Sequence, residues 1–434
     1  MGLFSRLFAL FSSDTRQPEP PRLAETKPAP LPVAPEVFIR WTEVLDGQGR
    51  IAAHLLQPLA LSPNAPVRAP AILEALRQHE IPTSAASRMV ILPLTFKQWS
   101  EADFSEMIGP VTHVLLAGLT LQSTPGEIAA WAAQIREKQG KVAIDDVLLP
   151  VLPELFKLAD VLHVDVACQT LPALERKLAV WRSERPDLPL LATGISTWAE
   201  QRLYQSMGVH YGTGSFVGEP DVSEQAGKIG ESRLVVMDML NALRRDAALG
   251  EVTAIAKRDP AVVVKLLERV NAPIYGLGRQ VGSLDEVVMI LGREALYRWL
   301  SIALFSLDGN GAKDQTLLFL ALCRAGLLET LAPQDRKRAA ELYLVGLLSV
   351  VDSLLGIPRD HLLDKMHLAS PVADALLRNT GPYARHWALV QALEQGDIPQ
   401  ALALAEVLQI GLAELSDNYR KAVVEAQALA VSVS

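Results

Sequence analysis

The sequence predicts an α/β domain built as a closed barrel, followed by an all-α domain. Between residues 37 and 223, short apolar segments alternate with segments of helical periodicity, which indicates a mostly parallel sheet. From residue 232 to residue 434 the periodicity is helical throughout. The chain has 434 residues, 50% of them hydrophobic, and this is enough to bury the cores of two ordinary domains.

Residues 1–36 are predicted to form a tail outside both domains. Residues 17–35 are rich in proline, which favours an extended linker. Residues 1–12 place leucine and phenylalanine side chains along one side of a short helix, and we expect this segment to be able to contact a membrane surface or a partner. It is too short for a signal peptide and lacks a small-residue cleavage site.

Eight segments of the first domain have the pattern of strands. The expected strands span residues 37–45, 50–57, 89–94, 113–117, 141–144, 161–166, 188–193 and 209–212. Eight strands that alternate with helices indicate a (β/α)8 barrel, in which functional side chains lie at the carboxyl ends of the strands.

Composition excludes several classes of protein. A net charge of -8 disfavours a wide electropositive surface, so we expect no nucleic-acid partner. Cys168 and Cys323 are far apart in sequence, which argues against a disulfide framework or a structural zinc site and fits a reducing compartment. No apolar run approaches the roughly 20 residues that span a bilayer. These observations predict a cytoplasmic protein.

The second domain contains a distinctive helix–loop–helix segment, residues 259–305. Asp259 and Pro260 fit an N-cap followed by proline at the first helical position, and Ser283 with Glu286 fits a capping box. The segment resembles the core signature of HDOD domains, which are all-helical bacterial modules related to the HD phosphohydrolases. The signature residues are Asp259, Pro260, Lys265, Leu267, Asn271, Gly276, Ser283 and Gly292.

A later helix, residues 343–356, resembles the helix that carries the metal-binding His-Asp pair of true HD hydrolases. Ser349 and Val350 stand where that pair would be. Metal ions need oxygen or imidazole donors at such positions. The resemblance therefore implies a module that binds another signalling protein.

The first domain resembles the EAL family, barrel enzymes that hydrolyse the bacterial second messenger cyclic di-GMP with two metal ions. Four stretches match the family in order: IAAHLLQP from Ile51, KVAIDDVLLP from Lys141, VLHVDVA from Val161 and GVHYGTGSFVGEP from Gly208. With the HDOD segment, they imply a two-domain EAL-HDOD signalling protein with a degenerate EAL domain.

The EAL resemblance assigns a set of barrel-mouth positions, which we regard as vestigial. They are His54, Asp145, Asp146, His163, Asp165, Thr193, Ser196 and Thr213. Only the three aspartates agree with the family pattern, because the other residues stand where the family has glutamate, lysine or glutamine. Pro58 replaces an arginine that would grip phosphate.

Two-metal hydrolysis needs several oxygen ligands that converge on the ions. We therefore predict no catalytic residue, no metal, no cofactor and no enzymatic activity, and a regulator that acts through protein–protein contacts of the HDOD domain. Two alternatives stay open. One is a receptor that binds cyclic di-GMP without hydrolysing it. The other is a metal-dependent hydrolase whose rebuilt site combines His54 and His163 with the aspartates.

Overall fold

A computed structural model of the chain describes residues 36–61, 67–79, 88–117, 124–223, 229–271, 281–305, 307, 311–361, 366 and 368–433. The predicted tail, including the expected contact segment at residues 1–12, lies outside the described residues except for residue 36. Gly276 of the HDOD signature also lies outside them.

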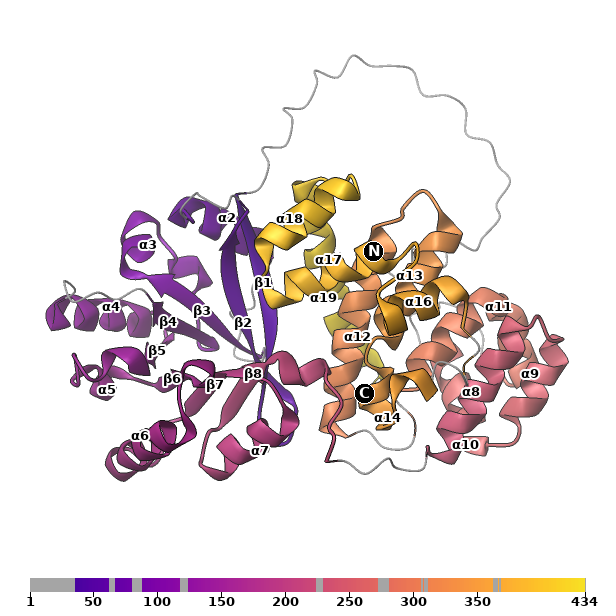
Figure 1. Ribbon diagram of the computed structural model, residues 1–434, viewed down its shortest axis with the longest axis horizontal. Helices are drawn as coiled ribbons and strands as arrows, with labels where there is room; N and C mark the ends of the chain where they lie inside the picture. Colours follow the sequence, from indigo (N-terminus) through magenta and orange to yellow (C-terminus); the bar gives the residue numbers. More distant parts are fainter. Residues whose placement is uncertain are drawn as a thin grey trace, which may run out of the picture.

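The first domain is a closed barrel whose strands follow one another in sequence order (Figure 1). The strands are β1 (Val37–Leu45), β2 (Ile51–Ala60), β3 (Met89–Thr95), β4 (Thr112–Ala117), β5 (Lys141–Asp145), β6 (Val161–Asp165), β7 (Leu190–Ile195) and β8 (Tyr211–Gly214). Strands β2 to β8 run parallel, and β1 is antiparallel to both neighbours. The predicted fold class is confirmed.

Helices surround the parallel part of this barrel. They are α2 (Ala69–Gln78), α3 (Phe96–Glu101), α4 (Pro125–Glu137), α5 (Leu155–Leu158), α6 (Leu171–Glu184) and α7 (Trp198–Ser206). Capping boxes at Thr95, Thr124 and Thr197 fix where α3, α4 and α7 begin, since each threonine side chain accepts the backbone N–H three residues on.

The barrel interior is a small apolar cluster. Most strands contribute to it side chains that point to the inner face of the sheet. Its buried members are Val44, Ala53, Leu55, Ile91, Leu115, Ala143, Val161 and Leu191. Alternate residues such as Leu56 and Leu162 point outward into a second, larger core. The phase of each strand decides which side chains reach the barrel mouth.

The second domain is all-helical. Its helices are α8 (Glu231–Arg244), α9 (Leu249–Ala256), α10 (Pro260–Val270), α11 (Leu284–Ala303), α12 (Ala312–Thr330), α13 (Arg336–Leu348), α14 (Val351–Leu355), α16 (Ser370–Arg378), α17 (Ala384–Gln395), α18 (Ile398–Val407) and α19 (Leu412–Val433). Among the described residues no single helix is long and apolar enough to cross a membrane, although α18 and most of α19 meet that test as a pair bent by 110°.

Several HDOD signature residues fix the connections between helices. Asp259 accepts the Ala261 N–H (2.8 Å), and Ser283 accepts the Glu286 N–H (3.2 Å). Asn271 holds the end of α10 beside Val281, because its amide exchanges two hydrogen bonds with the backbone of Val281 (2.9 and 2.7 Å). Gly292 adopts a φ of 70° within α11. These described signature residues have structural roles.

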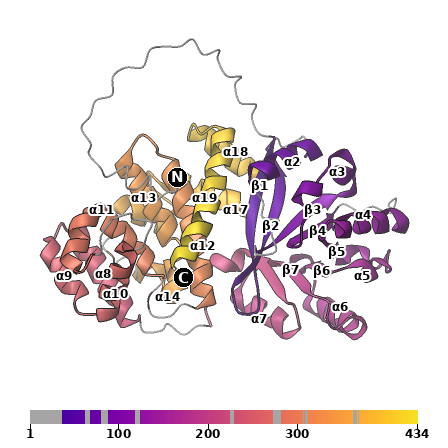
Figure 2. The same ribbon diagram turned by 180° about the vertical axis from the view of Figure 1, so that it is seen from behind.

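The two domains share one continuous core. Figures 1 and 2 show α12, α17 and α19 beside β1 and β2 from opposite sides of the molecule. The Tyr419 hydroxyl bonds both backbone groups of Trp41 (3.2 and 3.3 Å), and its ring lies 4.8 Å from that of Phe38. Thr316 of α12 donates to the carbonyl of Gly49 (2.8 Å). The helical domain therefore covers the β1–β2 hairpin.

Candidate functional site at the barrel mouth

The barrel mouth opens into a cavity of about 630 Å³ that also has walls from the helical domain. On the barrel side it is lined by residues that include Gln57, His163, Asp165, Thr193 and Thr213. On the other side α12, α17 and α19 contribute, among others, Cys323, Arg324, Gln391, Glu394 and Tyr419. A cavity of this size suits a small-molecule ligand.

The helical domain reaches this cavity where the barrel closes. The register between β1 and β8 contains one pair, Leu45 with Gly212. Arg40 and Thr42 of β1 line the cavity beyond that pair. The turn η4 (Ser215–Gly218), which follows β8, contacts α12. The seam between the first and last strands thus connects the barrel mouth to the second domain.

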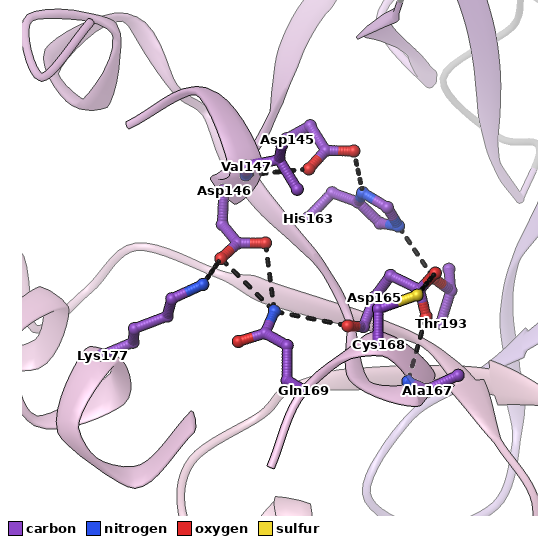
Figure 3. Close-up of polar contacts among 10 residues, drawn as sticks. All are labelled: Asp145, Asp146, Val147, His163, Asp165, Ala167, Cys168, Gln169, Lys177 and Thr193. Carbon is purple, nitrogen blue, oxygen red and sulfur yellow. Dashed lines mark hydrogen bonds and ion pairs between the residues drawn. The ribbon is translucent and has the colours of Figure 1, made fainter. Parts of the chain in front are cut away.

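Three mouth residues form a closed polar cluster, shown in Figure 3. The carboxylate of Asp145 accepts from Nδ1 of His163 (3.1 Å) and from the N–H of Val147 (3.1 Å). Nε2 of His163 lies 2.9 Å from the hydroxyl of Thr193. Burial opposes ionisation of Asp145, but its hydrogen bonds to His163 and Val147 outweigh that effect and hold its pKa below the ordinary value.

Asp165 also lies at the mouth, but its carboxylate is engaged locally. Oδ1 accepts the N–H of Ala167 (3.1 Å), and Oδ2 lies 3.6 Å from Sγ of Cys168. Gly194, with a φ of 81°, gives Asp165 its space, because a Cβ there would lie 2.7 Å from Oδ1. Asp165 therefore stabilises the turn that follows β6 while it lines the cavity.

The structure corrects the placement of His54. Ala53 and Leu55 face the barrel interior, so His54 faces outward, where its ring lies 5.6 Å from that of Phe319 on α12. Burial lowers the pKa of His54 to about 3, with a smaller contribution from Arg88. Gln57 lies at the mouth instead, so the strand phase is one residue away from the assigned one.

Asp146 and Ser196 are also placed away from the cavity. The Asp146 side chain is fully buried behind the mouth, where Nζ of Lys177 (2.5 Å) and the amide of Gln169 (3.4 Å) bond its carboxylate. Ser196 is exposed, and its N–H donates to Oε2 of Glu200 (2.8 Å). Both residues stabilise segments that follow strands and do not line the cavity.

Among the described residues, two buried hydroxyls at the cavity have no hydrogen-bond partner. They are Oγ1 of Thr42 on β1 and Oγ1 of Thr213 on β8. A buried hydroxyl that makes no hydrogen bond costs about 1–3 kcal/mol. Such atoms at a cavity are candidates for contact with a ligand.

Sequence reasoning missed a charged wall between the domains. Arg324 of α12 binds Glu394 of α17 through two hydrogen bonds (2.7 and 2.8 Å) and donates to Oγ of Ser349 (2.9 Å). Arg40 donates to the backbone carbonyl of Glu394 (3.1 Å) and to the side chain of Gln57. The sequence did contain one signal for this wall, the lone Arg324 inside the apolar run LLFLALCRAGLL. An arginine that is buried among apolar residues is expected to have a charged partner.

Glu43 lines the same wall from β1. Burial raises the pKa of Glu43 to about 7, and the negative charge of Glu394 adds to that shift, while a backbone hydrogen bond, Arg324 and Arg40 oppose it. The Glu43 carboxyl group therefore changes its charge near neutral pH.

The donors at the mouth do not fit a pair of divalent metal ions. The carboxylates of Asp145 and Asp165 are engaged as described, and the described part of the chain contains no group of three or more His, Cys, Asp or Glu side chains that could hold a metal ion. A hard divalent ion takes about six oxygen ligands. The alternative site with His54 and His163 is not formed, because His54 faces outward.

Comparison with known families identifies the second domain. Residues 233–356 match the family model of the HDOD domain, which covers α8 to α14. The match confirms the predicted HDOD domain, and the first domain is an eight-stranded barrel similar to EAL domain structures. The expected domain boundaries, 37–223 and 232–434, stay predictions.

Similar proteins come from several bacteria. The chain is 25% identical over 252 residues to the uncharacterized protein YuxH of Bacillus subtilis, across 57% of this chain and 61% of that protein. It is 24% identical over 210 residues to the cyclic di-GMP phosphodiesterase CdgJ of Vibrio cholerae, across 48% of each. The EAL domain of FimX from Xanthomonas citri, in complex with c-diGMP, aligns with a TM-score of 0.33 and 12% identity over 42% of this chain and 87% of that one.

These comparisons correct one expectation. The chain spans about half to three-fifths of the length of the curated relatives that it matches. The sequence predicted that the protein is not an enzyme. This prediction is wrong as stated, because the relative CdgJ is a cyclic di-GMP phosphodiesterase. The replaced residues at the mouth do not establish that this chain is inactive.

Proposed function

We propose that this protein is a cytoplasmic signalling protein whose barrel mouth binds cyclic di-GMP and whose helical domain passes the occupancy of that site to a partner protein. The main support for the proposal is one cavity whose walls come from both domains. The nature of the nucleotide is supported by the similarity to CdgJ. A ligand in such a cavity contacts the barrel and the HDOD domain at once.

A physical route leads from this cavity into the HDOD domain. Arg324 lines the cavity and bonds Ser349 at the end of α13, which precedes α14. Ser353 of α14 donates to the carbonyl of Gly218 in η4, at the barrel mouth (2.8 Å). A ligand that prefers one arrangement of these contacts shifts the population of that arrangement in α13 and α14.

The far side of the helical domain is the proposed partner surface. Figure 1 shows α8, α9, α10 and α11 on the side of the second domain away from the barrel. The HDOD match includes all four helices. The ligand site and the proposed partner surface are therefore distinct, as a relay between two sites requires.

Calorimetric titration of the full chain with cyclic di-GMP tests the proposed binding, with magnesium and then manganese present. We expect saturable heat with a dissociation constant in the micromolar range or below, about -8 kcal/mol or more favourable. The absence of heat at millimolar nucleotide would refute the proposal. Chromatography of the recovered nucleotide shows whether binding is accompanied by hydrolysis, and either result is compatible with binding at the mouth.

Hydrogen exchange tests the relay separately. Ligand is expected to slow the exchange of amides in α12, α13 and α14 as well as at the barrel mouth. Binding that changes exchange only in the barrel would leave a cyclic di-GMP-binding barrel and would contradict the role given to the helical domain.

A further inference from the structure

We infer that Arg40 on β1 and Arg324 on α12 form a shared anion site, in which the two domains together hold a phosphate group of the ligand. This inference rests on the proposed function for the identity of the ligand. It goes further by assigning phosphate recognition to a pair of side chains that no single domain supplies.

Both guanidinium groups are anchored to the same residue. Arg40 bonds the backbone carbonyl of Glu394, and Arg324 bonds its carboxylate. Gly396, at the end of α17, permits this close approach, because a Cβ there would lie 2.5 Å from Nη1 of Arg40. One residue of α17 therefore brings together cations that are 284 positions apart in sequence.

The polar atoms left unsatisfied at this wall are of the kind that a phosphate group satisfies. Nε of Arg40 and the hydroxyls of Thr42 and Thr213 are buried, and none has a hydrogen-bond partner among the described residues. All three residues line the cavity. A phosphate group offers several acceptor oxygens to such N–H and O–H donors.

The carboxylates around the cavity allow an anion to bind. Asp165 caps its own turn, and Glu219, the residue after η4, is exposed to solvent, although its charge still acts on Arg324. Glu43 is partly protonated near neutral pH, so its repulsion of an anion is reduced. Glu394 is the direct competitor, because it occupies the two donor positions of Arg324 that a phosphate would use. In the absence of ligand, Glu394 takes the place of the anion.

The competition also explains how binding would reach the HDOD domain. Arg324 donates to Glu394 and to Ser349 from the same guanidinium group. Its aromatic neighbour Trp387 lies 5.4 Å away as a cation–π partner. Exchange of Glu394 for a phosphate turns the guanidinium group and changes its bond to Ser349.

The helical domain contains a matched pair that does not line the cavity. Arg298 of α11 binds Glu329 of α12 through two hydrogen bonds (2.6 and 2.8 Å) and lies over the ring of Tyr343 (3.6 Å). Its side chains are 20% and 30% exposed, against 12% and 27% for Arg324 and Glu394. The two pairs have similar geometry and exposure. Neutralising Arg298 and Glu329 therefore shows the effect of losing a buried ion pair alone, whereas neutralising Arg324 and Glu394 also removes the proposed anion site.

Titration of the full-length protein and three variants with cyclic di-GMP tests the inference. Glu394→Gln removes the competitor, and we expect affinity to rise about tenfold. The double variant R324Q/E394Q removes both charges of the ion pair, so neither is left buried without the other, and we expect affinity to fall at least about a hundredfold with a weaker dependence on salt. The control R298Q/E329Q is expected to bind within about threefold of the unmodified protein.

The outcomes distinguish this inference from the proposed function. If the unmodified protein binds the nucleotide but R324Q/E394Q binds it equally well, the shared anion site is wrong and nucleotide binding stands. If the unmodified protein does not bind the nucleotide, inorganic pyrophosphate becomes the probe. Thermal stabilisation of the Glu394→Gln variant by pyrophosphate, absent in R324Q/E394Q, supports the anion site. Equal stabilisation of both variants, or of neither, overturns it.

Discussion

Two groups of polar side chains near the barrel mouth make their hydrogen bonds in different ways. In the closed cluster, Asp145, His163 and Thr193 come from the neighbouring strands β5, β6 and β7 and bond one another. In the wall between domains, Arg40 of the barrel and Arg324 of the helical domain both bond Glu394 of the helical domain. Nε of Arg40 has no hydrogen-bond partner among the described residues. The cluster makes its hydrogen bonds within the barrel and therefore stabilises the barrel. The wall makes its hydrogen bonds across a domain boundary, and these bonds can be exchanged for bonds to a ligand.

This difference has a physical origin in the fold. Carboxyl ends of adjacent parallel strands lie side by side, so short polar side chains there meet without help from elsewhere. At the seam between β1 and β8 the strand register contains one pair, and side chains of α12 and α17 complete the wall. We therefore expect mutations in the cluster to change stability and mutations in the wall to change binding.

The largest expected effect belongs to His54, which lies in neither region and serves as a control for both. Its folded pKa, about 3, is below the ordinary 6.5, so its contribution to stability is present above pH 6.5 and is lost as pH falls toward 3. Between pH 7 and pH 4 the unmodified protein should therefore lose about 3 kcal/mol more of its free energy of unfolding than the His54→Leu variant loses. Urea unfolding at the two pH values measures this difference.

The same variant tests the corrected placement of His54. Since His54 faces α12, His54→Leu is expected to leave the affinity for cyclic di-GMP within about threefold. A large loss of affinity at unchanged stability would place His54 back at the barrel mouth and would contradict its outward-facing position on β2.

Glu43 gives the next largest effect and sharpens the description of the wall. Its folded pKa, about 7, is above the ordinary value of 4.5, so its contribution is present below pH 4.5 and is lost as pH rises through 7. The charges of Glu394, Arg324 and Arg40 act on the pKa of Glu43. The charge of Glu43 in turn adds to the effect of burial in raising the pKa of Tyr419. Between pH 5 and pH 8, the unmodified protein should lose about 2 kcal/mol of stability that Glu43→Gln does not lose.

Binding provides a second reading of the Glu43 variant. Ionised Glu43 repels an anionic ligand, so the affinity of the unmodified protein should fall between pH 6 and pH 8, while that of Glu43→Gln stays nearly constant. Parallel pH profiles for the two proteins would show that Glu43 does not face the bound anion.

Asp145→Asn tests the closed cluster. The substitution removes the charge that accepts from His163 and the Val147 N–H, and we expect a loss of about 1–2 kcal/mol at pH 7. Because the pKa of Asp145 is lowered, this contribution is present above the ordinary carboxyl pKa and disappears as pH falls below it. Chemical unfolding at pH 7 and pH 3 measures the change, with the exposed Asp187→Asn as control.

The comparison predicts that Asp145→Asn leaves nucleotide affinity within about threefold. A loss of binding as large as that expected for R324Q/E394Q would remove the distinction between the closed cluster and the wall. The closed cluster would then belong to the ligand site.

The sequence was sufficient for the architecture because its local signals agree with one another. The strands and the caps at Asp259 and Ser283 each follow from short patterns. The phase of β2 did not follow, because α12 covers its outer face and both Leu55 and Leu56 are buried. A strand buried on both faces has no alternation of polar and apolar residues to show which side chains point inward.

The wall between domains could not be predicted for a different reason. Arg40 bonds the carbonyl of Glu394 across 354 positions of sequence. The EAL-like motifs involve only residues that a single barrel brings together, whereas Arg324 and Glu394 belong to helices of the other domain. Tertiary structure was needed to show that these charges are buried against one another.

The smallest expected effect is at Thr213, whose buried hydroxyl at the cavity has no partner in the part of the chain that the structure describes. Thr213→Val removes an unsatisfied polar group, so it should stabilise the protein by about 1 kcal/mol. It should also weaken ligand binding about three- to tenfold, because the hydroxyl can no longer bond the ligand. Thermal unfolding and calorimetry of the same sample measure both changes.

Thr112→Val is the matched control, because Thr112 is as buried but fully bonded. Its hydroxyl donates to the carbonyl of Met107 (3.0 Å) and accepts the N–H of Gly109 (3.2 Å). We expect Thr112→Val to destabilise the protein by about 1 kcal/mol and to leave binding unchanged. The two valine substitutions should therefore change stability in opposite directions. If Thr213→Val destabilises the protein as Thr112→Val does, the Thr213 hydroxyl already has a hydrogen-bond partner. The polar groups of the wall would then be satisfied within the protein, like those of the closed cluster.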